Sequence, residues 1–90
     1  MIELRAIIYG RVQLVMFRDF TQRKARKLGI RGYVKNRFDG AVEVVAQGEK
    51  EDLEKLLEAL HQGSLLSRVD AVENEWREPA KKFDDFSIVY

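Results

Sequence analysis

Residues 30–47, IRGYVKNRFDGAVEVVAQ, contain the two β-rich runs that decide the fold. In each run apolar residues fall on one face of a strand, as expected where one side of a sheet packs on a core. Asp39 and Gly40 lie between the runs, and an Asp-Gly pair in that place is a strong signal of a tight turn. The stretch therefore predicts an antiparallel hairpin of residues 30–36 and 41–47. The residues on its buried face are expected to be Ile30 and Val34 in the first strand and Val42, Val44 and Ala46 in the second.

A strand, a loop and a helix are predicted before this hairpin. Residues 2–9 alternate with a period of two, which favours a strand with one face against a core. Residues 10–16, GRVQLVM, fit neither the strand nor the helix period and are interpreted as a loop. From residue 17 the apolar residues recur at helical spacing as far as Leu28, and Gly29 then provides a helix C-cap.

A second helix and two further strands are predicted after the hairpin. The acidic stretch of residues 48–63 contains four leucines at helical spacing and ends with His61 near its last turn, where the helix dipole favours a surface histidine. Residues 68–76 are strand-like, and residues 86–90 predict a short strand that pairs at a sheet edge. The buried residues expected in the strand of residues 68–76 are Val69, Val72 and Trp76.

The order β-α-β-β-α-β with a terminal strand predicts an α+β fold. It is the ferredoxin-like βαββαβ sandwich, an antiparallel sheet with two helices on one face and a short C-terminal strand. Ninety residues allow one domain, residues 1–90. Enzymes, RNA-binding proteins and small-molecule sensors share this fold, so function has to be argued from a site.

Composition excludes several classes of site. The chain has no cysteine and a single histidine, which excludes disulfides, thiol nucleophiles, cysteine-ligated metal sites and multi-histidine metal clusters. No apolar run approaches the roughly 18 residues that span a bilayer, and no signal peptide is recognisable. The sequence therefore predicts a cytoplasmic protein without a membrane partner, and its mixed polar surface predicts a monomer.

Basic residues gather in one part of the chain. Residues 11–37 contain nine bases and one acid, Asp19, whereas residues 39–85 contain thirteen acids and six bases. Such a segment attracts phosphates, carboxylates or nucleic acid, although a solvated basic helix face explains Arg23, Lys24, Arg26 and Lys27 equally well.

The loop of residues 10–18 is the candidate anion site. Where a strand feeds a helix through a short loop, backbone N–H groups can converge beside the positive end of the helix dipole. Arg18 in the first helical turn could fork onto two phosphate oxygens. An ordinary connection with a surface arginine is the alternative.

Three motifs here resemble the acylphosphatase family: G-R-V-Q-x-V-x-F-R at residues 10–18, A-x-x-L-G-I-x-G-Y-V-K-N at residues 25–36 and D-G-A-V-E-V-V-A-Q-G at residues 39–48. The resemblance extends over residues 4–90. It implies hydrolysis of small acyl phosphates to a carboxylate and inorganic phosphate, without metal, cofactor or covalent intermediate. By the same resemblance Arg18 binds the phosphate and Asn36 orients the attacking water. The main-chain phosphate cradle maps onto Val12, Gln13, Leu14, Val15, Met16 and Phe17.

Leu14 stands where the family's cradle has a second glycine. If that position requires φ > 0, a leucine there costs roughly 1–2 kcal/mol and its side chain crowds the acyl group. Two hypotheses therefore stay open, an active acylphosphatase and a catalytically impaired phosphate-binding or structural member of the same family. Met16 occupies a variable position and gives no such concern.

A nucleic-acid partner is the remaining alternative for the basic segment. Tyr9, Tyr33 and Phe38 with nearby bases would suit an RNA-binding sheet that stacks bases on exposed rings. The central strand of residues 41–47 carries Glu43 where such a sheet needs an aromatic residue. No nucleic-acid binding is therefore expected.

Overall fold

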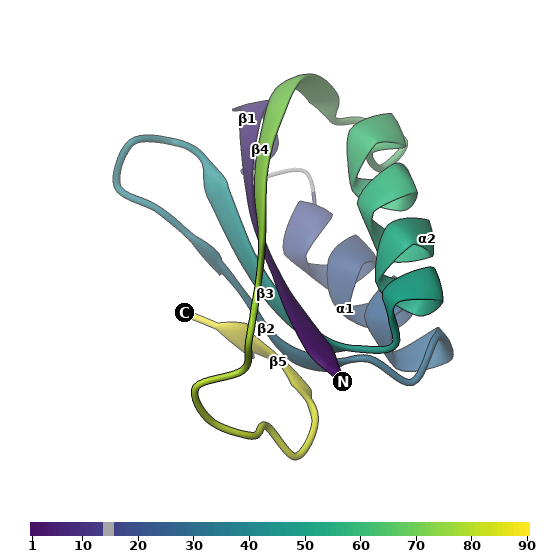
Figure 1. The fold of residues 1–90 in the computed structure, drawn as a ribbon. Helices are drawn as coiled ribbons and strands as arrows, with labels where there is room; N and C mark the ends of the chain where they lie inside the picture. Colours follow the sequence, from purple (N-terminus) through teal and green to yellow (C-terminus); the bar gives the residue numbers. More distant parts are fainter. Residues whose placement is uncertain (14–15) are drawn as a thin grey trace.

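A five-stranded sheet carries two helices against one of its faces in the computed structural model, which describes residues 1–13 and 16–90 (Figure 1). The elements follow the predicted order. They are β1 (Ile2–Arg11), α1 (Phe17–Lys27), β2 (Arg31–Asn36), β3 (Val42–Gly48), α2 (Lys50–Gln62), β4 (Arg68–Arg77) and β5 (Phe86–Val89).

The sheet has the strand order β4-β1-β3-β2-β5. The pairs β1–β3, β1–β4 and β2–β3 are antiparallel, which confirms the predicted hairpin and its ferredoxin-like frame. The terminal strand β5 lies at the edge, as expected, but it runs parallel to β2, so the sheet is mixed. Periodicity identifies a strand without fixing its direction, and here the connection of residues 78–85 sets that direction.

The core lies between the sheet and the two helices. Its side chains come from alternate positions of the strands and from one stripe of each helix, as the apolar spacing predicts. Its largest buried side chains include Leu4, Ile8, Val34, Val42 and Val44 from the sheet, Leu53, Leu56 and Leu60 from α2, Phe17 from α1 and Phe86 from β5.

Strand β1 is longer than predicted. It continues to Arg11 with an irregularity in its pairing to β4 between Tyr9 and Gly10, so Gly10 belongs to the strand and not to the loop. Gly10 has φ +130°, and a Cβ there would lie 2.1 Å from the carbonyl oxygen of Arg68. Only glycine permits this close approach of β4 and this backbone conformation.

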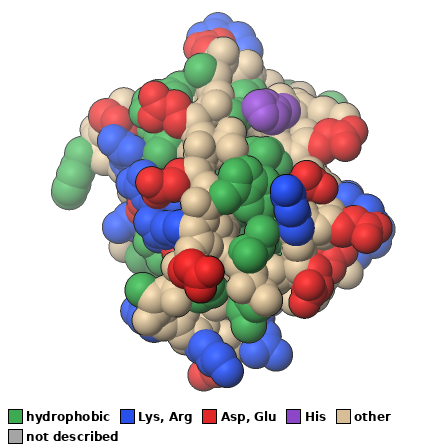
Figure 2. All heavy atoms as spheres, viewed as in Figure 1, with side chains coloured by type: hydrophobic (Ala, Val, Ile, Leu, Met, Phe, Trp, Pro, Cys, Tyr) green, Lys and Arg blue, Asp and Glu red, His purple; other side chains and the backbone are tan. Residues whose placement is uncertain are grey.

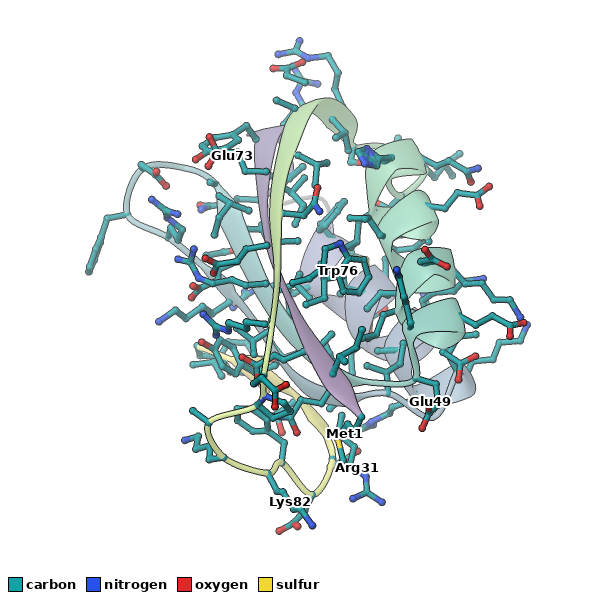
Figure 3. The ribbon with its side chains drawn as sticks, viewed as in Figure 1. Met1, Arg31, Glu49, Glu73, Trp76 and Lys82 are labelled. Atoms are coloured by element: carbon teal, nitrogen blue, oxygen red, sulfur yellow. The ribbon has the colours of Figure 1, made fainter. Side chains whose placement is uncertain are left out.

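The expectation of three buried residues on β4 is correct only in part, because Val69 and Val72 pack against the core and Trp76 does not. Val69 and Val72 are partly buried, and Trp76 is 38% exposed. Trp76 projects between β4 and α2, where the Lys50 ammonium lies 6.0 Å from its ring centre (Figure 3). Because β4 is an edge strand, α2 covers these side chains on one side only.

Asp85 fixes the start of β5 against two other elements. Its backbone carbonyl accepts a hydrogen bond from the Gly32 N–H at 2.9 Å, and its carboxylate accepts one from Arg26 of α1 at 2.9 Å. The Phe86 backbone N–H also donates to this carboxylate, and that bond, with the Arg26 guanidinium, lowers the pKa of Asp85 below its usual value. These contacts place β5 beside β2.

Candidate functional site

One cavity of about 280 Å³ lies where the loop after β1, the start of α1 and the ends of β2 and β5 meet. Both predicted side chains, Arg18 and Asn36, line it. Leu14 and Val15 lie outside the described residues. The predicted cradle residues that line the cavity are Val12, Gln13, Met16 and Phe17, and the lining residues not predicted are Asp19, Ile88 and Tyr90.

The N-terminus of α1 forms one wall of this cavity. The hydrogen bond from the Phe20 N–H to the Met16 carbonyl, 3.0 Å long, is the first of the helix, so the N–H groups of the preceding residues have no intrahelical acceptor. Phe17, Arg18 and Asp19 supply these groups and all three line the cavity. Free N–H groups at the positive end of a helix dipole attract an anion.

Arg18 is the only basic residue that lines this cavity in the described part of the chain. One of its guanidinium N–H groups donates to the Val89 carbonyl at 3.1 Å, and the guanidinium carbon lies 4.8 Å from the centre of the Tyr90 ring. Among the described residues its other N–H groups have no acceptor, so they are available to an anion. The C-terminal segment therefore positions Arg18 without using up its donors.

The other bases of α1 do not belong to this site. Arg23 pairs with Asp19 at 3.0 Å, four residues earlier, and Arg26 pairs with Asp85. Arg23, Arg26 and Lys27 are exposed and Lys24 is half-buried. The interpretation of this segment as a solvated basic helix face describes these residues, whereas Arg18 stands apart from them.

Asn36 is the last residue of β2 and lines the cavity. Its side-chain oxygen Oδ1 is buried and has no hydrogen-bond donor among the described residues. A buried carbonyl oxygen without a protein donor is normally satisfied by a water molecule, because leaving it unpaired is unfavourable by about 1–3 kcal/mol. The amide oxygen of Asn36 therefore has hydrogen-bonding capacity that the described residues leave unfilled.

The side chain of Gln13 connects the loop after β1 to the β2–β3 hairpin. Its Nε2 donates to the backbone carbonyls of Arg37 and Ala41, both at 2.9 Å. These two carbonyls belong to the turn of the β2–β3 hairpin, directly after Asn36. The bonds tie the loop to the hairpin and so fix its position relative to Asn36. The only sequence signal for this role is an amide among apolar loop residues.

Met16 has a left-handed backbone conformation, whereas Leu14, where the sequence analysis considers φ > 0, lies outside the described residues. It has φ 58° and ψ 27°, the left-handed region, and it is the only non-glycine residue with positive φ in the described chain. It precedes the first residue of α1 and is 72% exposed. The expectation that Met16 gives no conformational concern is therefore wrong. A side chain at this conformation costs roughly 1–2 kcal/mol.

We expect Met16→Asn to raise the free energy of unfolding by about 1 kcal/mol, because asparagine tolerates the left-handed region and little apolar burial is lost. Met16→Val should lower it by about the same amount, because a branched Cβ is disfavoured there. Urea denaturation of the parent and both variants measures the difference. Equal stability of the two variants would contradict a left-handed conformation at this position.

No cluster of three or more His, Asp or Glu side chains that could hold a metal ion occurs within residues 1–13 and 16–90. His61 lies in the last turn of α2, is exposed, and does not line the cavity. In the same described ranges, neither helix has the length and apolar character needed to cross a membrane.

Comparison with known proteins assigns the family. The acylphosphatase family model matches residues 4–88. An acylphosphatase of Thermus thermophilus is 54% identical over 86% of this chain and 88% of its own, and one of Salinibacter ruber is 45% identical over 92% and 87%. The crystal structure of acylphosphatase from Bacillus subtilis superposes with a TM-score of 0.96 at 41% identity, covering 100% of both chains. The chain therefore belongs to the acylphosphatase family of enzymes.

Proposed function

We propose that this protein hydrolyses the carboxyl–phosphate bond of small acyl phosphates, releasing a carboxylate and inorganic phosphate. The observation that carries the proposal is one cavity lined by an arginine, by the first residues of a helix whose N–H groups have no intrahelical acceptor, and by an asparagine whose amide oxygen has no donor among the described residues. The family assignment supports the reaction class, and the roles of the individual residues are our inference.

The phosphoryl group is bound by the positive charge of Arg18 and by hydrogen-bond donors that point at its oxygens. The guanidinium of Arg18 donates two parallel N–H bonds to phosphate oxygens, and the first-turn N–H groups of α1 donate to the others. These donors lie in place before the reaction and stabilise the negative charge that spreads over the phosphoryl oxygens in the transition state. Asp19, the acid on the cavity wall, is neutralised by Arg23 and does not oppose the anion.

Asn36 positions the nucleophile. Its Oδ1 accepts a hydrogen bond from a water molecule, which attacks phosphorus in line with the leaving carboxylate. The new P–O bond forms as the bond to the acyl oxygen breaks, and the proton of the water passes to a phosphate oxygen. A strong base is unnecessary because the carboxylate is a good leaving group, so an amide is sufficient.

Turnover of benzoyl phosphate tests the proposed reaction directly. Purified protein should release equal amounts of benzoate and inorganic phosphate, with inorganic phosphate as a competitive inhibitor. Binding of inorganic phosphate without hydrolysis would instead support the alternative hypothesis, a catalytically impaired phosphate-binding member of the family, which is based on Leu14.

We expect Leu14→Gly to raise both turnover and affinity for inorganic phosphate. Glycine removes a side chain from the cradle loop and permits φ > 0 at no steric cost. Release of up to roughly 1–2 kcal/mol of strain would raise the free energy of unfolding, and the extra unfolded-state entropy of glycine would lower it by about 0.5–1 kcal/mol. The sign of the change in the free energy of unfolding therefore shows which effect is larger. The parent and the variant are compared for acyl-phosphate turnover and urea stability. A variant no faster than the parent would show that leucine is accommodated in a working cradle.

A further inference from the structure

Met16 places an exposed thioether at the phosphate cavity. It directly precedes α1 and lines the cavity together with Phe17 and Arg18. The residue is 72% exposed, so a small solute can reach its sulfur atom from solvent. The chain contains no cysteine, and its two methionines, Met1 and Met16, are therefore its only sulfur atoms. An oxidant that reacts with sulfur has no thiol to consume it before it reaches Met16.

Hydrogen peroxide converts a methionine thioether into a sulfoxide. The sulfur lone pair attacks one peroxide oxygen, and an S–O bond forms as the O–O bond breaks. The departing hydroxide takes the proton of the new S–OH group and becomes water. Sulfur is thereby oxidised by two electrons and the peroxide is reduced. The product carries a polar oxygen that accepts hydrogen bonds, whereas the thioether sulfur accepts them only weakly.

A sulfoxide at this position lies among the donors that bind phosphate in the proposed function. Met16 is two residues before Arg18, whose guanidinium has N–H groups without an acceptor among the described residues, and it adjoins the free N–H groups of the first turn of α1. A methionine side chain has three rotatable bonds, so its oxidised end can turn toward these donors. The negative end of the S–O dipole then competes with a phosphate oxygen for the same hydrogen bonds.

We propose that Met16 is a peroxide-sensitive modification site whose oxidation lowers the affinity of the cavity for phosphate. Methionine sulfoxide reductases reverse the modification, so the change acts as a switch. The inference rests on the proposed function for the ligand and adds redox control of the same site. Because Met16 is exposed, its oxidation buries no new polar atom, and the fold should persist.

Met1 and Trp76 can also be oxidised, but neither lines the cavity. Met1 precedes β1 and is 57% exposed, and the ten residues of β1, about 30 Å of extended strand, lie between it and the loop (Figure 3). Figure 2 shows hydrophobic side-chain atoms between β4 and α2, the region of Trp76, which is 38% exposed. A variant that lacks only the Met16 thioether therefore separates the effect of Met16 from oxidation elsewhere.

The test treats the parent protein and Met16→Leu with hydrogen peroxide and locates the added oxygen by peptide mass spectrometry. Full oxidation of Met16 in the parent should weaken binding of inorganic phosphate about fivefold, measured by calorimetry, and raise KM for benzoyl phosphate by a similar factor. Treatment with methionine sulfoxide reductases should restore both values. Met16→Leu keeps the Met1 thioether, and its phosphate affinity should be the same before and after oxidation.

Met16→Gln tests the same idea without an oxidant. Its amide oxygen accepts hydrogen bonds as a sulfoxide oxygen does, so this variant should bind phosphate more weakly than Met16→Leu. Equal phosphate affinity of the two variants would overturn the proposal, as would an oxidised parent with unchanged affinity or an equal loss in oxidised Met16→Leu. A large drop in urea stability of the oxidised parent would also overturn it, because unfolding would then explain the loss.

Failure of the proposed function has a different signature. The untreated parent would then bind inorganic phosphate without hydrolysing benzoyl phosphate. The calorimetric comparison of reduced and oxidised protein does not depend on turnover, so it still decides whether Met16 controls the phosphate site.

Discussion

Arg18→Lys should lower kcat/KM for acyl phosphates by at least about 100-fold while the protein stays folded. Lysine keeps the positive charge, but it cannot donate two parallel N–H bonds to phosphate oxygens, and it loses the contact that the guanidinium makes with the Tyr90 ring. The loss should appear in kcat and in affinity for inorganic phosphate together, because the same donors bind the ground state and stabilise the transition state. Steady-state kinetics with benzoyl phosphate and phosphate inhibition measure both quantities.

Arg23→Lys provides the matched control for this experiment. Arg23 lies on the same helix, is exposed, pairs with Asp19 and does not line the cavity. Its substitution should leave kcat/KM close to that of the parent, and urea denaturation of both variants should give nearly parental stability. Retention of most of the activity by Arg18→Lys would remove Arg18 from the phosphate site.

The hairpin and both helices could be predicted from the sequence because their signals are local. Alternation in residues 41–47 and the Asp-Gly turn specify β3 and its pairing with β2, and the leucine spacing of α2 specifies its buried face. The burial of β4 could not be predicted in the same way. Whether Trp76 is covered depends on which strand ends the sheet, and this is a property of the topology.

Arg18 of α1 and Asn36 of β2 could also be predicted, because the loop and the residues before the hairpin turn resemble the acylphosphatase motifs. The contribution of β5 to the site could not be predicted. Val89 and Tyr90 contact Arg18 across 71 residues or more of sequence, and nothing near Arg18 indicates that partner. The left-handed conformation of Met16 was missed because methionine is not a residue that marks positive φ.

Asn36→Ala should lower kcat by about 100-fold and leave inhibition by inorganic phosphate nearly unchanged. The amide oxygen is proposed to hold the attacking water, so its removal leaves the nucleophile without an orienting acceptor. Asn36 carries no charge and belongs to β2, not to the α1 N-terminus that supplies the phosphate donors, so the phosphate keeps those donors. Single-turnover kinetics and phosphate inhibition separate the two effects.

Asn74→Ala is the matched control, because Asn74 is an exposed strand asparagine on β4 that does not line the cavity. It should behave as the parent in both measurements. An equal loss of turnover and phosphate affinity in Asn36→Ala would assign Asn36 to phosphate binding and leave the water without an orienting group. Loss of kcat alone means that the buried oxygen acts on the nucleophile, and phosphate binding then rests on Arg18 and the helix N-terminus.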